Sequence, residues 1–338
     1  MSNQVWKQLP TLTRRTYRGG KLLGRFLGQA EDMDTDCPED WISSFVEAKN
    51  KEYIPNEGIT RVLSDRGECL ITEAVKTSDF GEGRENSGVL IKLLDAGERL
   101  GIQVHPTKEY AKEHFGTPYG KTECWYILDT RDEEACVYLG FKEHVTKAYF
   151  KALFEQQDIP AMLDAMHCFK VRKGDVILVT AGTPHAIGAG CFLLEIQEPT
   201  DYTMRAEKVT VAGERLTPQQ IHYGVGEEAM LDCFSYCGAS REETRTRHFL
   251  PNREVRTGEI DLVQYTDTAC FALKRIAGGV YQAKETCFVT VVVTENGGTL
   301  SCGDRSVSLW RGDKYFISAN TDFILTNATA VLCYPPRL

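Results

Sequence analysis

The sequence predicts a mainly β protein made of two barrels, with a small helical section between or beside them. Two strand-rich regions support this prediction, one over residues 88–200 and one over residues 260–338. Apolar runs in the second region are separated by turn residues every 8–12 residues, a spacing typical of a sandwich or small barrel. We expect a first unit over residues 1–235, which includes N-terminal strands and the helical section, and a second unit over residues 236–338.

The length of the chain agrees with a globular protein of two units, and its net charge limits the classes of partner that it can bind. A chain of 338 residues is too long for one ordinary sandwich and suits two cores. The formal net charge of −9 argues against nucleic acid, because phosphate backbones require clustered Lys and Arg. A local basic pocket for one small phosphate remains compatible with that charge.

The sequence contains no feature that directs it to a membrane or out of the cell. No apolar run approaches the roughly 18 residues of a membrane span, and the N-terminus lacks the apolar core of a signal peptide. The twelve cysteines are scattered and mostly lie in apolar runs, as expected for reduced, buried thiols. We therefore expect a cytoplasmic protein without a membrane partner.

The N-terminal part is expected to form short elements. Residues 18–28 contain four glycines and read as turns between an N-terminal strand and a short helix. Residues 41–48 have the composition of a strand. Residues 88–106 follow as a strand, a turn at Asp95–Gly97 and a second strand.

Helices and further strands are expected in the middle of the chain. Residues 107–116 predict a short helix, because Thr107 is a good N-cap and Gly116 a good stop. The β-rich runs over 123–130 and 133–141 predict a hairpin. Residues 146–168 predict two helices separated by a break at Pro160.

In the last third of the chain we expect one helical stretch, a linker and then a series of strands. Residues 215–234 look helical after the Thr217 cap, and residues 235–255 look like a polar linker. From about residue 260 onward, strand follows strand.

Four residues of the first strand-rich region have the chemistry of metal ligands. Gln103 and His105 are two apart on a predicted strand, so their side chains share one face. Glu123 opens the next strand, and His185 follows a tight turn at the end of an apolar strand. Two nitrogen and two oxygen ligands with open positions suit zinc or another divalent metal. The remaining histidines we leave as ordinary packed or surface residues: His114, His144, His167, His222 and His248.

The spacing of these residues resembles the motifs of the cupin superfamily. Gly174, Gly182 and His185 fit the register of the second cupin motif, with Thr180 where proline is usual. The first motif normally reads His-x-His, and here it reads Gln103-Val104-His105.

Four separated blocks narrow the resemblance to type I mannose-6-phosphate isomerases, in the compact layout of their shorter bacterial members. The blocks are Ile102–Pro106, Gly120–Leu128, Lys173–Gly190 and Leu194–Arg205. The resemblance implies a double cupin with one zinc ion per chain, a catalytic first half and a sugar phosphate as substrate. It implies interconversion of mannose 6-phosphate and fructose 6-phosphate through an enediol, by a monomer or homodimer.

The resemblance also assigns site residues. It implies that the metal ligands are Gln103, His105, Glu123 and His185. Arg205, Lys121 and Glu195 match the active-site arginine, the active-site lysine and a glutamate proposed to move the proton. These types suit the chemistry, because a guanidinium stabilises an oxyanion and a carboxylate on an apolar strand can act as a general base. Strand alternation places Glu195 on the face opposite Leu194 and Ile196.

Three departures from the family leave the substrate open. Gly101 stands where the family has a serine associated with phosphate binding. The N-terminal aromatic–Gly–Gly motif is interrupted by Arg18, and the usual tryptophan-containing strand is altered to residues 39–48. An unphosphorylated sugar or another sugar phosphate therefore remains an alternative.

Other functions are weighed against the isomerase. A non-catalytic, sugar-sensing cupin would have no need for the set Lys121, Glu195 and Arg205. A cupin oxygenase would favour a second histidine at position 103. The second barrel has no histidine after His248, so we expect it to be structural and without metal ligands.

Overall fold

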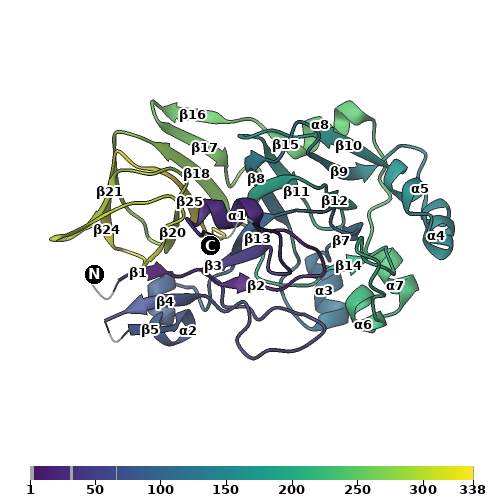
Figure 1. The fold of residues 1–338 in the computed structure, drawn as a ribbon, viewed down its shortest axis with the longest axis horizontal. Coiled ribbons are helices and arrows are strands. Elements are labelled where there is room, and N and C mark those ends of the chain that lie inside the picture. Colours follow the sequence, from purple (N-terminus) through teal and green to yellow (C-terminus); the bar gives the residue numbers. More distant parts are fainter. Residues whose placement is uncertain (1–3, 31–32, 66, 338) are drawn as a thin grey trace.

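A computed structural model describes residues 4–30, 33–65 and 67–337 of the chain. It is mainly β, as predicted, and consists of two barrels that lie side by side (Figure 1). Most helices gather at the end of the first barrel that is remote from the second.

The first barrel is built from a seven-stranded and a five-stranded antiparallel sheet. In spatial order, the seven-stranded sheet contains β15 (Phe249–Leu250), β11 (Val176–Val179), β8 (Glu123–Thr130), β13 (Cys191–Gln197), β6 (Leu90–Asp95), β3 (Glu39–Ile42) and β2 (Leu12–Thr13). The five-stranded sheet contains β10 (Met166–Lys170), β9 (Cys136–Phe141), β12 (His185–Ile187), β7 (Gln103–Val104) and β14 (Met204–Arg205).

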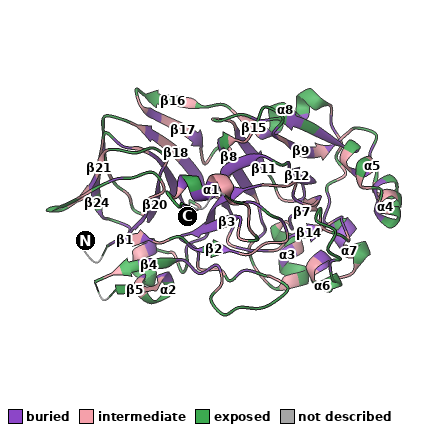
Figure 2. Cartoon of the chain, in the orientation of Figure 1, coloured by how far each residue is buried: buried purple, intermediate pink, exposed green. Residues whose placement is uncertain are grey.

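Both faces of the seven-stranded sheet are buried, which explains its continuous apolar runs. On β8, Trp125 and Ile127 point into the barrel. Their neighbours Cys124 and Tyr126 point the other way, into a core shared with the second barrel. Figure 2 accordingly shows the central strands as buried and the outer helices as largely exposed.

The second barrel combines a nine-stranded and a four-stranded sheet. The nine-stranded sheet contains β16 (Arg253–Arg256), β17 (Glu259–Val263), β18 (Ala272–Ala277), β25 (Thr329–Tyr334), β20 (Val289–Val293), β23 (Lys314–Ile317), β1 (Val5–Gln8), β4 (Arg61–Ser64) and β5 (Gly67–Leu70). The four-stranded sheet contains β19 (Val280–Lys284), β24 (Asp322–Thr326), β21 (Thr299–Cys302) and β22 (Arg305–Ser308).

Three N-terminal strands belong to the sheet of the second barrel. Strand β1 pairs with β23, with Trp6 opposite Phe316, and also with β4. The chain therefore crosses between the barrels more than once. The division at residue 235 stays a prediction, and its outer limits, residues 1 and 338, lie outside the described residues.

The helices occupy most of the predicted places. They are α1 (Lys21–Phe26), α2 (Ile71–Ala74), η1 (Thr77–Phe80), α3 (Lys108–Phe115), α4 (Lys147–Gln156), α5 (Ile159–Asp164), α6 (Pro218–His222), α7 (Glu227–Asp232) and α8 (Arg241–His248). Thr107 caps α3, and Gly116 ends it in the left-handed conformation. The break between α4 and α5 falls at Gln157 and Asp158, and Pro160 lies in the first turn of α5, where proline is tolerated.

The predicted hairpin of residues 123–141 is wrong. Strand β8 pairs with β11 and β13, whereas β9 pairs with β10 and β12 in the other sheet. The chain changes sheets after β8, where Arg131 binds Asp34 and Asp95 with its guanidinium. Alternation revealed the two strands but not the sheet to which each belongs.

Two other predictions also need correction. Residues 235–255 are not a linker, because they contain α8 and β15. Ser240 and Glu243 form a capping box at the start of α8, and Thr244 and His248 are buried. Of the strand expected at residues 41–48, only Trp41 and Ile42 lie in β3.

Among the described residues, no helix combines the length and apolar character that a membrane span requires.

Candidate metal centre

The four predicted ligands meet at one end of the first barrel. Strands β7 and β12 are paired with Gln103 opposite His185, which places these two side chains next to each other. His105 follows β7, and its carbonyl accepts a hydrogen bond from the Gly182 amide in the turn before His185. Glu123 is the first residue of β8, in the facing sheet. Both sheets therefore contribute to the site.

Backbone carbonyls determine which nitrogen each histidine presents. His105 Nδ1 lies 3.0 Å from the Tyr202 carbonyl oxygen, and His185 Nδ1 lies 2.9 Å from that of Thr183. A carbonyl only accepts hydrogen bonds, so Nδ1 carries the proton in both rings. Each Nε2 is then left with the lone pair that binds a metal.

The donor atoms are spaced as zinc requires. His105 Nε2 lies 3.0 Å from one Glu123 carboxylate oxygen, and His185 Nε2 lies 3.4 Å from the other. With metal–ligand distances of about 2.0–2.1 Å, neighbouring ligands of a tetrahedral zinc are roughly 3.3 Å apart. Among the residues described, these three form the one group of His, Cys, Asp and Glu close enough to share a metal ion.

Two further observations support a cation in this place. Both Glu123 oxygens are buried and receive no contact with hydrogen-bond geometry from the described part of the chain, although one of them forms an ion pair with Lys121. The Lys121 ammonium stands among the donors, 2.8 Å from His105 Nε2 and 3.1 Å from Glu123. The amide nitrogen of Gln103 is 3.1 Å from His185 Nε2. Turning this amide over would present its oxygen, the atom that binds metals.

The protonation states also suit metal binding. Burial lowers the pKa of His105 well below its usual value, and the Lys121 charge lowers it further. Burial likewise lowers the pKa of His185. Burial alone would raise the pKa of Glu123, but the charge of Lys121 holds it below its usual range. Neutral imidazoles and an ionised carboxylate are the forms that bind zinc.

One pocket connects the predicted metal ligands with the predicted catalytic residues. It encloses about 440 Å³ of empty space, counting the part open to solvent. Its wall includes Gly101, Gln103, Lys121, Glu195 and Arg205. Positions up to 190 residues apart in the sequence, Arg15 and Arg205, thus line one cavity beside the donor atoms.

Glu195 points into the barrel, on the face predicted from strand alternation. Its side chain is buried and accepts a hydrogen bond of 3.2 Å from the Trp125 indole. The Lys92 ammonium lies 3.4 Å from its other oxygen. Glu195 is thus a buried carboxylate at the pocket wall, paired with a lysine.

The Arg205 side chain is held by backbone carbonyl groups and not by carboxylates. Its guanidinium donates hydrogen bonds to the carbonyls of Thr203 and Gln220. No carboxylate among the described residues forms an ion pair with it. Its positive charge is therefore available to an anionic group in the pocket.

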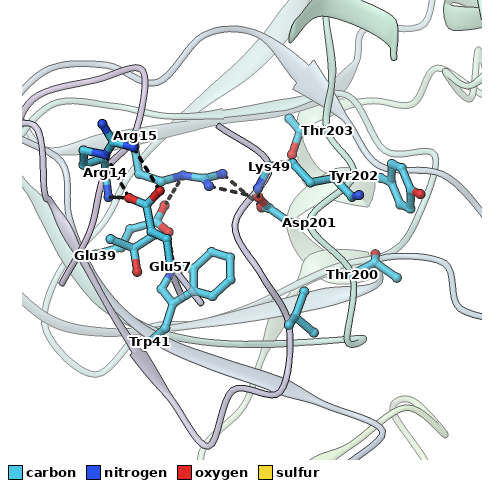
Figure 3. A network of polar contacts seen from close by, with 12 residues as sticks. Arg14, Arg15, Glu39, Trp41, Lys49, Glu57, Thr200, Asp201, Tyr202 and Thr203 are labelled. Atoms are coloured by element: carbon cyan, nitrogen blue, oxygen red, sulfur yellow. Dashed lines mark hydrogen bonds and ion pairs between the residues drawn. The ribbon is translucent and has the colours of Figure 1, made fainter. Parts of the chain in front are cut away.

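Sequence reasoning missed four charged residues at this pocket, of which Arg15, Glu39 and Lys92 lie in its wall and Asp201 is bound by Arg15. Lys92 lies 3.6 Å from Glu39. Glu39 in turn contacts Arg15, and Arg15 forms two hydrogen bonds with Asp201 (Figure 3). Lys92 had a signal, since it is a charge inside the apolar run of residues 88–96. The contact between Arg15 and Asp201 joins positions 186 apart, which no local pattern reveals.

The altered N-terminal motifs still reach the pocket. Tyr17 is buried and donates a hydrogen bond of 2.7 Å to Glu39. The Trp41 indole donates one of 2.7 Å to the other oxygen of the same carboxylate. The interposed Arg18 points elsewhere, to the Asp34 carbonyl. Tyr17 and Trp41, one from each altered motif, therefore both hold Glu39.

Fold and site together define a double-barrel protein of the cupin type with a buried His-Glu-His centre. No family model matches the chain. Over 117 residues, 35% of this chain and 36% of the relative, it is 43% identical to the probable mannose-6-phosphate isomerase GmuF of Bacillus subtilis. The chain thus matches about a third of the length of that relative.

A longer match points to the same class. Over 244 residues, 72% of this chain and 73% of the relative, the chain is 28% identical to the putative mannose-6-phosphate isomerase YvyI of the same organism.

Solved structures share the fold. The mannose 6-phosphate isomerase of Bacillus subtilis superposes with a TM-score of 0.75, covering 98% of this chain and 99% of that chain at 21% identity. A zinc-bound mannose 6-phosphate isomerase gives a TM-score of 0.73, covering 99% and 100% at 16% identity. The resemblance to type I mannose-6-phosphate isomerases is confirmed.

Proposed function

We propose that the chain is a zinc-dependent aldose–ketose isomerase that interconverts mannose 6-phosphate and fructose 6-phosphate. The observation that carries this proposal is the single pocket in which the donor set of Gln103, His105, Glu123 and His185 adjoins Lys121, Glu195 and Arg205. The names of the matched relatives point to the same reaction.

The reaction moves a proton between C1 and C2 of the sugar and passes through an enediol. Zinc, when bound by the four ligands, supplies a Lewis acid beside the sugar oxygens. Glu195, buried in the pocket wall, takes the proton from one carbon and returns it to the other. The Arg205 guanidinium stabilises the negative charge that develops on oxygen. Lys121 lies between the metal ligands and the pocket and binds a sugar oxygen.

The charge of the site favours a phosphorylated sugar. Four basic and four acidic side chains surround the pocket and its donor set: Arg15, Lys92, Lys121, Arg205, Glu39, Glu123, Glu195 and Asp201. These charges cancel, and both histidine ligands are neutral, so a bound zinc ion leaves two positive charges. A phosphate monoester carries about −1.5 to −2 near neutral pH and would balance them.

A second candidate is the isomerisation of an unphosphorylated sugar, and Gly101 favours it. A serine hydroxyl at this point of the pocket would add a donor for phosphate, and glycine supplies none. A non-catalytic sugar sensor is the remaining alternative, although it would have no use for the buried carboxylate of Glu195.

The experiment is an isomerase assay with purified, zinc-loaded protein. Mannose 6-phosphate and free mannose are supplied separately, and the ketose products are followed by NMR. The proposal expects fructose 6-phosphate to form from mannose 6-phosphate. It also expects kcat/KM to be much higher for mannose 6-phosphate than for free mannose. Turnover of free mannose alone would favour the second candidate. Zinc binding without turnover of either sugar would favour the sensor.

A further inference from the structure

A chain of buried charges runs from the loop of Asp201 along the pocket wall to Glu195. In order, the groups are Asp201, Arg15, Glu39, Lys92 and Glu195, and their signs alternate. Arg15 is the link from the N-terminal segment, with only 9% of its side chain exposed. Its Nη1 and Nη2 atoms each lie 3.0 Å from a different oxygen of Asp201. This bidentate geometry fixes the relative orientation of the two side chains and also strengthens their interaction.

The Asp201 end of this chain lies next to a metal ligand. Tyr202 follows Asp201 directly, and the Tyr202 carbonyl holds Nδ1 of His105. The backbone of this loop is fixed from several sides. The Lys49 amide donates a hydrogen bond of 2.8 Å to Asp201, and the Tyr223 hydroxyl donates one of 2.9 Å to the Asp201 carbonyl. The loop that orients His105 therefore depends on how Asp201 is anchored.

Asp201 needs a cation to remain ionised in this place. Burial alone would raise its pKa, but the charges of Arg15 and Lys92 hold it well below its usual range. Without Arg15, a buried carboxylate would lose its two strongest hydrogen bonds, and the loop would rearrange or admit water.

We propose that Arg15 is a positioning residue of the metal centre: it anchors Asp201, and the Asp201 loop presents the Tyr202 carbonyl that orients His105. Outer partners of metal ligands typically contribute 10–100-fold to metal affinity. Arg15 touches no ligand, so its effect passes through the backbone of the 201–202 loop. This inference concerns metal affinity and holds whichever sugar the site accepts.

The neighbouring arginine offers a matched control. Arg14 has the same side chain and binds a carboxylate too, but its partner is Glu57, through contacts of 3.0–3.2 Å. Figure 3 shows the two guanidinium groups directed at different carboxylates. The structure gives Arg14 no contact with Asp201 or with the loop that holds His105.

The test compares the full-length variants Arg15→Gln, Arg14→Gln and Asp201→Asn with the wild type. Metal is removed, and zinc is returned in competition with a chromophoric chelator to obtain the dissociation constant. The absorption spectrum of cobalt-substituted protein reports ligand geometry independently of activity. We expect Arg15→Gln and Asp201→Asn to weaken zinc binding about tenfold or more and to change the cobalt spectrum. Arg14→Gln should remain within about twofold of the wild type.

A double variant separates this route from a general loss of stability. If Arg15 acts through Asp201, the variant with both substitutions binds zinc no more weakly than the poorer single variant, because coupled residues are not additive. Circular dichroism shows which variants fold. If Arg15→Gln does not fold, the inference is tested with Asp201→Asn and Arg15→Lys instead. Arg15→Lys keeps the positive charge but loses the two-pronged contact of the guanidinium with Asp201. Wild-type zinc affinity in folded Asp201→Asn, or an equal loss in Arg14→Gln, would overturn the inference.

Discussion

At the scale of single residues, two carbonyl groups prepare the site for a metal. Tyr202 and Thr183 accept from Nδ1 of His105 and His185, so both Nε2 atoms face Glu123. This orientation needs no metal to enforce it. The chemistry of the site therefore depends on local backbone as much as on ligand identity.

Arg205 offers the sharpest catalytic test at this scale. Its guanidinium rests on two carbonyls, has no acidic partner in the described part of the chain and lines the pocket. We expect Arg205→Gln to lower kcat about 10²–10³-fold, the usual cost of removing an oxyanion donor. Zinc affinity should be unchanged. A fall in kcat of less than threefold would remove Arg205 from the catalytic role.

Gly101 tests the substrate. A Cβ atom added here meets nothing closer than 3.9 Å, where the Glu207 carboxylate begins, so a serine fits without strain. A new hydroxyl donor to a phosphate is worth roughly 1 kcal/mol, or about fivefold. We therefore expect Gly101→Ser to lower KM for mannose 6-phosphate several-fold and to leave kcat for that sugar unchanged. An unchanged or higher KM would show that the phosphate is bound elsewhere in the pocket.

At the scale of elements, the carboxylate of Asp95 holds both the start of α1 and the segment after β8 in which the chain passes from one sheet to the other. Asp95 ends β6 and accepts hydrogen bonds from the Gly20 and Leu22 amides at the start of α1. The same carboxylate receives Arg131, just after β8. A single buried side chain thus fixes a helix and the path of the chain into the second sheet.

Replacement of this anchor should be costly. Asp95→Asn leaves the helix start and Arg131 without their common anion, and breaking a buried ion pair costs about 3 kcal/mol. We expect the free energy of unfolding to fall by about that amount in urea denaturation. The exposed pair of Glu134 and Lys170 is the control, and Glu134→Gln should cost less than about 1 kcal/mol. Equal effects of the two substitutions would contradict this account.

The elements also show how far the sequence could lead. Periodicity and caps predicted α3 and the strands of the second barrel, because those signals are local. The pairing of β8 and β9 with other strands was missed, since alternation carries no information about sheet membership. Helix α8 was missed because its sequence is polar, although Ser240 and Glu243 formed a readable capping box.

The candidate site, too, could be predicted from the sequence only in part. Its four ligands were predicted from motif spacing and resemblance, and the structure places them together. Lys92 was visible as a charge inside an apolar strand, but nothing local in the sequence indicated its partners. Arg15 and Asp201 come from distant segments, so only the folded chain shows their contact.

At the scale of the whole molecule, buried histidines link stability to pH. Burial lowers the pKa of His105, His185 and His248. Below about pH 6.5 the unfolded chain therefore binds more protons at these positions than the folded chain does. The free energy of unfolding of metal-free protein should therefore fall as pH decreases from 6.5 to 5.5, by up to about 1 kcal/mol per histidine.

Denaturation in the presence of a chelator at several pH values measures this loss. The variant His248→Gln removes one titrating group that is not among the candidate ligands, and its pH dependence should be shallower. A stability that stays constant or rises as the pH falls through this range would contradict the buried, neutral state of these rings.

The central claim is that zinc bound by His105, Glu123, His185 and Gln103 makes this chain an isomerase. The most direct measurement is a zinc titration of metal-free protein while the conversion of mannose 6-phosphate is followed. We predict that activity is absent at first and rises to a plateau at about one zinc ion per chain. Under the same conditions, folded Glu123→Gln should remain inactive. Full activity of the metal-free protein, or wild-type activity of Glu123→Gln, would contradict the claim.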